Sequence, residues 1–276
     1  MKKLVLSVAL ITATLASIAQ LKMPAPSPLQ KIKQDFALGS LEVTYSRPSV
    51  KGRKIFGNHE PYNELWRTGA NAATILKLNE QVEIGGKKLD TGSYALYTIP
   101  NKDSWEVVLN KGVTNWGTDG YKESEDVVRF KVPAMKLPTL IETLTIQFAN
   151  ITPETCELHI MWEKTAIAIP IKADIKDRMR ASIEKAMEGD KKPYWQAAQF
   201  YNEYDKNNDK ALAATKAAIE GNPKAFWIYL YQAKIQLAMG DKVGAMDSSK
   251  KSLELATAAK NDTYIRDNVE LMKKLK

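Results

Sequence analysis

Three arginines fall within one stretch of irregular sequence, residues 45–74, which reads YSRPSVKGRKIFGNHEPYNELWRTGANAAT. Arg47, Arg53 and Arg67 can converge on a carboxylate, phosphate or sulfate group, because a planar guanidinium presents paired donors that match two oxygens of such an anion. Asn71 follows four residues after the third arginine and adds an amide. An anion is therefore the first ligand class that we expect at this stretch.

Aromatic residues accompany these arginines. Tyr45, Phe56, Tyr62 and Trp66 can line a sugar-stacking or apolar pocket, which makes a carbohydrate the second expected ligand class. We predict the following residues as ligand-binding: Arg47, Arg53, Trp66, Arg67, Asn71 and Tyr45.

The same residues can instead serve only to hold the loop in place, and we favour this structural interpretation over ligand binding. Arginines in a long loop can donate to backbone carbonyls and pair with carboxylates such as Glu42, Glu64 or Asp126. The aromatic side chains would then fill the end of a β-sandwich. A loop of this length inside a compact domain needs such internal anchors.

A second loop, which follows the strand around Trp105, carries aromatic residues of its own. Trp116 and Tyr121 can form a platform for a sugar ring beside the first stretch. They can also cover the core, which is the commoner use of aromatic side chains. We expect them to pack against the core.

No catalytic centre can be assigned from these residues. Cys156 alternates with apolar neighbours, which favours a buried and inert thiol. His59 and His159 lack the spacing of zinc ligands. Glycoside hydrolysis needs two carboxylates about 5–10 Å apart, and the sequence does not show which two would lie at that distance. The carboxylates available for such a pair are Glu42, Glu64, Asp126 and Glu142. We expect no metal and no cofactor.

Period-two alternation then predicts the elements that hold these loops. Leu144, Ile146 and Phe148 alternate with polar residues, as in a half-buried strand. Gly85-Gly86 predicts a tight hairpin turn, and Glu163-Lys164 a second short connection. Strands without intervening helices indicate an antiparallel β-sandwich or jelly-roll-like domain. The predicted strands are 41–45, 74–78, 81–84, 93–99, 105–110, 126–132, 142–148, 155–162 and 165–171.

From residue 174 the pattern changes to a helical period. We predict helices over 177–188, from Pro193 onward, and over 264–275. Residues 192–258 resemble tetratricopeptide repeats, with an aromatic and small residues at the matching positions. The fold class is thus mainly β plus α, with a β domain over 20–172 and a helical region over 173–276. A protein partner is expected on the helices.

The N-terminus predicts export. Residues 1–19 combine two lysines, an apolar run too short to span a bilayer, and a small-residue cleavage site, as in a secretory signal peptide. We expect a periplasmic or extracellular protein with no membrane span after signal cleavage. The formal net charge of +8 is spread thinly along the chain. Nucleic-acid binding requires a concentrated basic stripe, so we expect none.

Several motifs in order give a family resemblance: YSRPSVKGRKIFG, PYNELWRTGANAAT, GGKKLDTGSYALYTIP, WEVVLNK, WGTDGY and DVVRFKV. Residues 24–171 resemble the exported bacterial family of domain of unknown function 2911, and the pairing with C-terminal helices is similar to members of it. The resemblance implies no activity. We expect a non-catalytic binding or scaffolding protein of the cell envelope; the alternative is a hydrolase of an envelope polymer or glycan that holds its substrate with Arg67 and Asn71.

Overall fold

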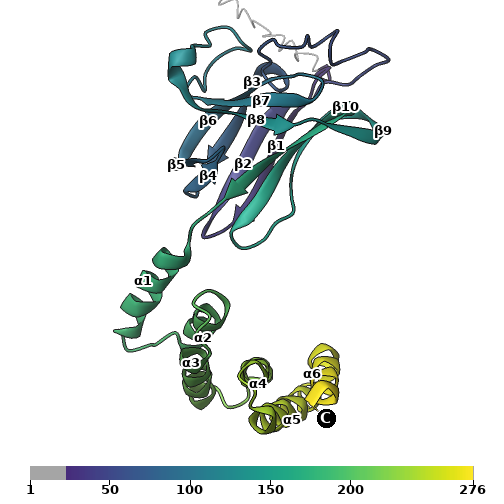
Figure 1. Ribbon diagram of the computed structural model, residues 1–276. Coiled ribbons are helices and arrows are strands. Elements are labelled where there is room, and N and C mark those ends of the chain that lie inside the picture. The colour runs from purple at the N-terminus through teal and green to yellow at the C-terminus, as the bar shows by residue number, and fades with distance from the viewer. Residues whose placement is uncertain (1–22, 276) are drawn as a thin grey trace, which may run out of the picture.

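Two antiparallel β-sheets are followed by six α-helices in the computed structural model, which describes residues 23–275 (Figure 1). The predicted signal peptide, residues 1–19, lies outside the described residues. Within the described part of the chain, no helix has both the length and the apolar character needed to cross a membrane. The expected fold class, a two-sheet β domain followed by helices, is confirmed.

The larger sheet has six strands in the order β1-β2-β3-β6-β7-β8, and the smaller has four in the order β5-β4-β10-β9. Antiparallel pairing runs through both sheets. The strands are β1 (Leu29–Phe36), β2 (Gly39–Ser46), β3 (Ala70–Leu78), β4 (Val82–Ile84), β5 (Lys87–Leu89), β6 (Gly92–Ile99), β7 (Ser104–Asn110), β8 (Asp126–Pro133), β9 (Met135–Ala149) and β10 (Thr155–Lys172).

The alternating residues of both sheets form one core between them. Leu41 and Val43 of the six-stranded sheet and Leu144 and Leu158 of the four-stranded sheet are fully buried. All four belong to a single apolar cluster. Burying these faces against each other is the main favourable contribution to folding. Because the strands pair into two separate sheets, the fold is a sandwich rather than a closed barrel.

β10 reverses direction within its span. The Ala173 amide, just after its end, donates to the Glu154 carbonyl, just before its start, over 2.8 Å. Glu163 at its centre has a left-handed φ of 54°. The predicted short connection at Glu163-Lys164 is therefore correct. The hairpin at Gly85-Gly86 is also confirmed, because these glycines have φ values of 60° and 77°.

The sequence did not predict β1. The prolines at positions 24, 26 and 28 favour an extended lead-in over residues 21–34, and the sequence gives it no strand partner. Leu29–Phe36 instead pairs with β2 in an unbroken antiparallel register. Prolines precede the strand rather than interrupt it, and a proline is tolerated where no ladder hydrogen bond is needed.

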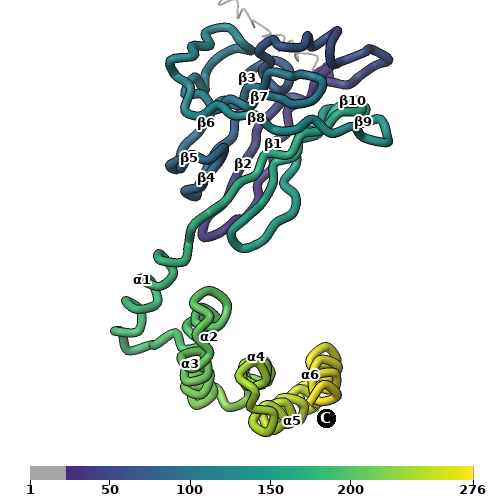
Figure 2. The backbone as a smooth tube through the Cα atoms, viewed as in Figure 1, coloured from purple at the N-terminus to yellow at the C-terminus, as the bar shows by residue number. Residues whose placement is uncertain are grey.

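The helices follow β10 and pack as successive neighbours (Figure 2). Small buried residues, such as Ala198, Ala211 and Ala245, let neighbouring helices approach closely. Pro193 stands immediately before α2, as predicted. The helices are α1 (Lys176–Met187), α2 (Tyr194–Glu203), α3 (Asn208–Gly221), α4 (Phe226–Ala238), α5 (Lys242–Ala258) and α6 (Asp262–Leu275).

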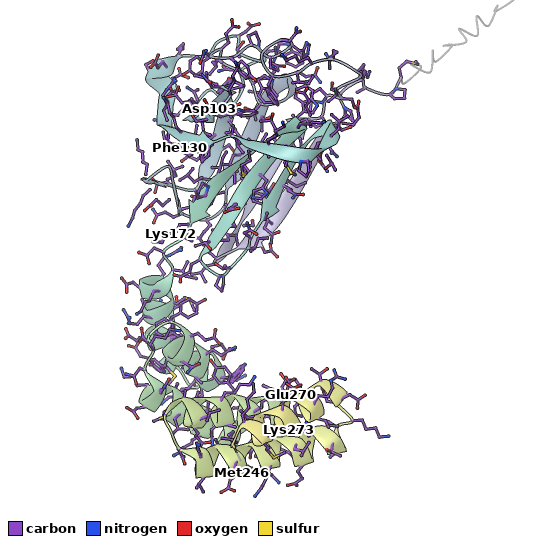
Figure 3. The ribbon with its side chains drawn as sticks, turned by 45° about the vertical axis from the view of Figure 1, so that its right-hand side comes forward. Asp103, Phe130, Lys172, Met246, Glu270 and Lys273 are labelled. Carbon is purple, nitrogen blue, oxygen red and sulfur yellow. The ribbon has the colours of Figure 1, made fainter. Side chains whose placement is uncertain are left out.

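The first helix is fastened to the β domain through a buried carboxylate. Glu80 accepts hydrogen bonds from the Leu38 and Gln81 amides and pairs with Arg178 of α1. In Figure 3, Lys172 marks the end of the β domain, and Lys273 lies on the last helix, far from it.

Candidate functional site

The loop of residues 47–69 connects β2 to β3, and its first arginine binds the opposite sheet. Arg47 donates from Nε to the Leu144 carbonyl over 2.9 Å and from Nη2 to Thr145 Oγ1 over 3.0 Å. Its backbone amide donates to the Pro28 carbonyl. These contacts join β9 to the start of the loop, so the Arg47 side chain has a structural role.

The second arginine closes a turn within the loop. Arg53 donates to the Val50 carbonyl over 3.0 Å and to the Ser49 carbonyl over 2.7 Å. Its Nη1 also lies 2.8 Å from Nε2 of His59. Desolvation and the Arg53 charge lower the pKa of His59, which favours the neutral imidazole, the form that can accept this hydrogen bond.

Two of the predicted binding residues, Tyr45 and Trp66, belong to the core. Trp66 is 4% exposed and stacks on Trp162 with ring centroids 5.8 Å apart. Phe56 packs edge-on against both Trp66 and Trp105. The Tyr45 hydroxyl donates to Gln30 and accepts from the Ile146 amide. The aromatic side chains therefore fill the end of the sandwich, as the structural interpretation expected.

Arg67 lies between two anchored residues of the loop. Trp66 exchanges two backbone hydrogen bonds with Thr98 of β6, and Thr68 is fully buried with its hydroxyl 3.0 Å from that of Thr98. Thr68 also has a left-handed φ of 55°. The backbone on both sides of Arg67 is therefore fixed by buried residues.

Arg67 is half-buried as a residue, and its guanidinium makes one hydrogen bond. Its Nη1 donates to the Asn71 carbonyl over 2.8 Å. Asn71 itself is exposed, has a left-handed φ of 63°, and donates from its amide to Ser46 Oγ. Within residues 23–275, the ion pairs of arginine belong to Arg129, Arg178 and Arg180. The expected pairing of Arg47, Arg53 and Arg67 with carboxylates is therefore wrong; backbone carbonyls take that place.

The second loop, residues 111–125, packs against Arg67 through one glycine. A Cβ built on Gly117 would lie 2.5 Å from Arg67 Nη1 and 2.6 Å from Cζ, so the guanidinium rests on the glycine backbone. The Tyr97 hydroxyl donates to the Gly117 carbonyl and accepts from the Asn115 amide. The outer face of β6 therefore fixes the loop, and a side chain at position 117 would displace Arg67.

The two aromatic residues of this second loop have different environments. Tyr121 packs on Tyr97 with ring centroids 5.2 Å apart, and its hydroxyl contacts both Asp126 and Arg129. Burial and the hydrogen bond to Asp126 raise the pKa of Tyr121 to about 12. Trp116, by contrast, is 64% exposed. The expected packing role holds for Tyr121 and is wrong for Trp116.

Glu60 is the titratable residue in the first loop with the largest perturbation. Burial raises its pKa to about 7, although the charges of Arg67 and Arg53 oppose this shift. The raised pKa reflects the cost of holding a carboxylate away from water. Glu60 therefore changes charge near neutral pH, close enough to Arg67 for the two charges to interact.

Residues 27–171 match a family described as a protein of unknown function, DUF2911. The chain belongs to this family. The DUF2911 region contains both loops and every residue predicted to bind a ligand, whereas the six helices follow it. No curated protein gives a significant match to the chain. Family membership is thus established for the β domain without supplying an activity.

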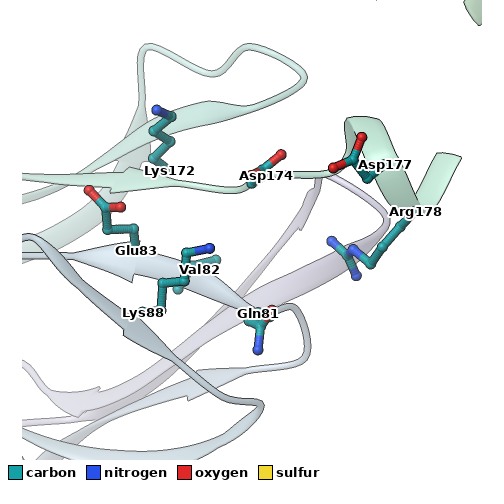
Figure 4. Close-up of a pocket in the computed structure, with 8 residues that line it drawn as sticks. All are labelled: Gln81, Val82, Glu83, Lys88, Lys172, Asp174, Asp177 and Arg178. Atoms are coloured by element: carbon teal, nitrogen blue, oxygen red, sulfur yellow. The ribbon is translucent and has the colours of Figure 1, made fainter. Parts of the chain in front are cut away.

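Other parts of the DUF2911 chain contain pockets of mixed character. A polar pocket of about 170 Å³ lies where β10 leads into α1, with Lys172 and Asp174 on one wall and Lys88 on the other (Figure 4). Cations and acids alternate around it, so no ligand charge is favoured. A groove of about 240 Å³ on the helices is lined by residues of α2, α4 and α6: Trp195, Gln199, Trp227, Leu230, Tyr231, Lys234, Tyr264 and Asp267.

The remaining chemistry-bearing residues are structural. Cys156 is free and buried, and burial raises the pKa of its thiol to about 12, as expected for an inert cysteine. His159 pairs with Glu157 over 2.7 Å. Residues 23–275 contain no group of three or more histidine, cysteine, aspartate or glutamate side chains placed to hold a metal ion.

Sequence reasoning missed two residues of this site. Glu60 gave no signal, because nothing in its neighbours indicates burial. Gly117 was visible in the WGTDGY motif, but its contact with Arg67 spans fifty residues of sequence. Such a contact depends on how the two loops fold over the outer face of β6.

Proposed function

We propose that this protein is an exported, non-catalytic binding module of the cell envelope, whose β domain holds an anionic or carbohydrate ligand at Arg67. One observation carries the proposal: Arg67 is partly buried, makes a single side-chain hydrogen bond, and has no ion-pair partner within residues 23–275. A partly desolvated cation gains more from an anion than a fully hydrated one does. Arg47 and Arg53 are less suited, because their donors are already engaged.

The binding test compares Arg67→Ala with Arg53→Ala. Arg53 is the matched control, since it lies in the same loop and carries the same charge. Binding to inorganic polyphosphate and to polyuronate oligosaccharides is measured by calorimetry on the mature protein. Arg67→Ala should weaken binding about tenfold or more, given the strength of charge-assisted hydrogen bonds. Equal affinity of the two variants would reject Arg67 as the binding residue.

A protein partner on the helices is the second part of the proposal. The groove on α2, α4 and α6 supports it, because four aromatic residues and few charges line it. A photoreactive cross-linker at Lys234, in the groove, should capture a defined protein in cells. The same cross-linker at Lys250, an exposed position of α5 outside the groove, should not. Identical capture from both positions would contradict the assignment.

The alternative function is hydrolysis of the ligand, and the raised pKa of Glu60 favours it. A carboxylic acid with a pKa of about 7 is suited to proton transfer at neutral pH. Incubation of the polyuronates with the protein, followed by analysis of chain length, tests this alternative. Cleavage that is abolished by Glu60→Gln and kept by Glu64→Gln would replace the binding module with an enzyme.

A further inference from the structure

Trp116 is an exposed tryptophan on a well-fixed loop. The other tryptophans of the chain, all within residues 23–275, are buried or partly buried, whereas Trp116 is 64% exposed. Its loop is held by hydrogen bonds: the Ala73 amide donates to the Asn115 carbonyl, and the Asp119 amide to the Trp116 carbonyl. Tryptophan is one of the residue types most enriched at the energetic centres of binding surfaces, so a largely exposed tryptophan on a fixed backbone is a candidate contact residue.

Trp116 is adjacent in sequence to a residue that contacts Arg67, the cation of the proposed binding site. The next residue, Gly117, is the one on which the Arg67 guanidinium rests. The Tyr97 hydroxyl binds the Gly117 carbonyl and so fixes the segment that carries both groups. The residue that carries the indole is thus adjacent in sequence to the glycine that contacts the Arg67 guanidinium over the outer face of β6.

We infer that the ligand at this surface is an acidic saccharide, a sugar chain whose rings bear carboxylates. This inference rests on the proposed function and names the ligand class for it. The face of a sugar ring carries C–H groups that pack on the electron-rich indole of Trp116. A ring carboxylate accepts two parallel N–H bonds from Arg67, which matches the planar geometry of both groups.

The two chemical groups of an acidic saccharide match different residues of the surface: the sugar ring matches Trp116, and the carboxylate matches Arg67. A neutral sugar leaves the Arg67 charge without a partner, and a bare polyanion such as polyphosphate leaves the Trp116 ring in water. The formal net charge is +8 for the whole sequence and +6 without Lys2 and Lys3 of the predicted signal peptide, and it adds a long-range attraction for an acidic polymer. Carboxylate and sugar ring together satisfy both residues.

The test uses ligands that differ in one property. Oligogalacturonate carries rings and carboxylates, its methyl ester keeps the rings and loses the charge, and polyphosphate keeps the charge without rings. Alginate and hyaluronan oligosaccharides extend the panel to other acidic saccharides. The variants are Arg67→Ala and Trp116→Ala, with Val113→Ala as a control because Val113 is an exposed apolar residue of the same loop.

Wild-type protein should bind at least one acidic saccharide and bind the methyl ester about tenfold more weakly. Trp116→Ala should weaken acidic-saccharide binding about tenfold and leave polyphosphate binding unchanged, while Val113→Ala changes neither. Trp116→Ala with wild-type affinity, or binding of polyphosphate alone, would overturn the saccharide inference and leave the anion site standing. Absence of binding to every probe would instead reject the proposed function itself, and with it this inference.

Discussion

Arg47 and Arg67 stand at the two ends of one loop, and their side chains are used in different ways. Arg47 donates to β9 on the opposite sheet, so its guanidinium is part of the seam between the sheets. Arg67 is turned to the outer face of β6 and keeps most of its donors unengaged. Two tryptophans repeat this contrast, because Trp66 is in the core and Trp116 is in water.

The contrast shows that residue type alone does not separate a loop anchor from a binding residue. Each arginine occurs in one of the family motifs, Arg47 in YSRPSVKGRKIFG and Arg67 in PYNELWRTGANAAT, and each is followed within two residues by a proline or glycine. What distinguishes them is whether folding supplies acceptors for the guanidinium. The anchors should therefore govern stability, and the outward pair should govern binding.

The largest expected effect comes from the two tryptophans. Trp66→Ala should lower the free energy of unfolding by about 3–5 kcal/mol, because it leaves a cavity among stacked aromatic rings. Trp116→Ala should change it by less than about 0.5 kcal/mol. Chemical denaturation monitored by circular dichroism measures both. A similar loss in the two variants would remove the distinction between the anchored and exposed segments.

Substitution of Arg47 should lower the free energy of unfolding more than substitution of Arg67, just as Trp66 should matter more for stability than Trp116. Arg47→Ala removes two hydrogen bonds to β9 and should cost about 1–3 kcal/mol of unfolding free energy. Arg67→Ala removes one and should cost about 1 kcal/mol or less. Thermal unfolding of the pair tests this order. If Arg67→Ala were the more destabilising variant, its guanidinium would count as an anchor too.

Gly117→Ala tests whether the position of the Arg67 guanidinium determines anion binding. The new methyl group would collide with the Arg67 guanidinium, so anion binding should fall as in Arg67→Ala. Its positive φ of 67° should also cost about 1 kcal/mol of stability. Gly120→Ala is the control, because Gly120 shares a positive φ but contacts Asn115 instead. Equal loss of binding in both variants would indicate loop strain rather than displacement of Arg67.

Glu60 provides a smaller effect that depends on pH. Its pKa is raised in the folded state, so the folded protein binds more protons than the unfolded chain between pH 4.5 and about 7. Stability therefore falls as pH rises through this window and stays lower above it. At pH 8, Glu60→Gln should raise the melting temperature by about 2–4 °C relative to wild type. Glu64→Gln, at an exposed position of the same loop, should show no such gain.

Ligand binding should respond to the same proton. An ionised Glu60 near Arg67 opposes an anionic ligand, so affinity should increase a few-fold between pH 8 and pH 6. Glu60→Gln should bind with nearly the same affinity at both values. A pH dependence that persists in this variant would assign the titration to another group.

Much of the β domain could be predicted from local patterns. Residues 142–148 alternate apolar with polar side chains, and residues 165–171 place an isoleucine at every second position from Ile167. The Gly85-Gly86 turn has a composition that favours left-handed backbone conformations. β1 escaped prediction because its LQKIKQDF sequence is mostly polar. It is an edge strand held by the backbone ladder with β2, and such pairing has no signature in the strand's own residues.

The candidate site separates what the local sequence determines from what only the tertiary structure determines. The sequence by itself determined the two-sheet fold class, the position of the irregular loop and the arginines and aromatic residues in it, because these depend on periodicity and residue type. Tertiary structure decided the rest: that Arg47 binds β9, that Gly117 supports Arg67, and that Trp116 stays in water. Each of these depends on long-range contacts between segments, whose partners supply or withhold the acceptors and apolar surface that a side chain requires.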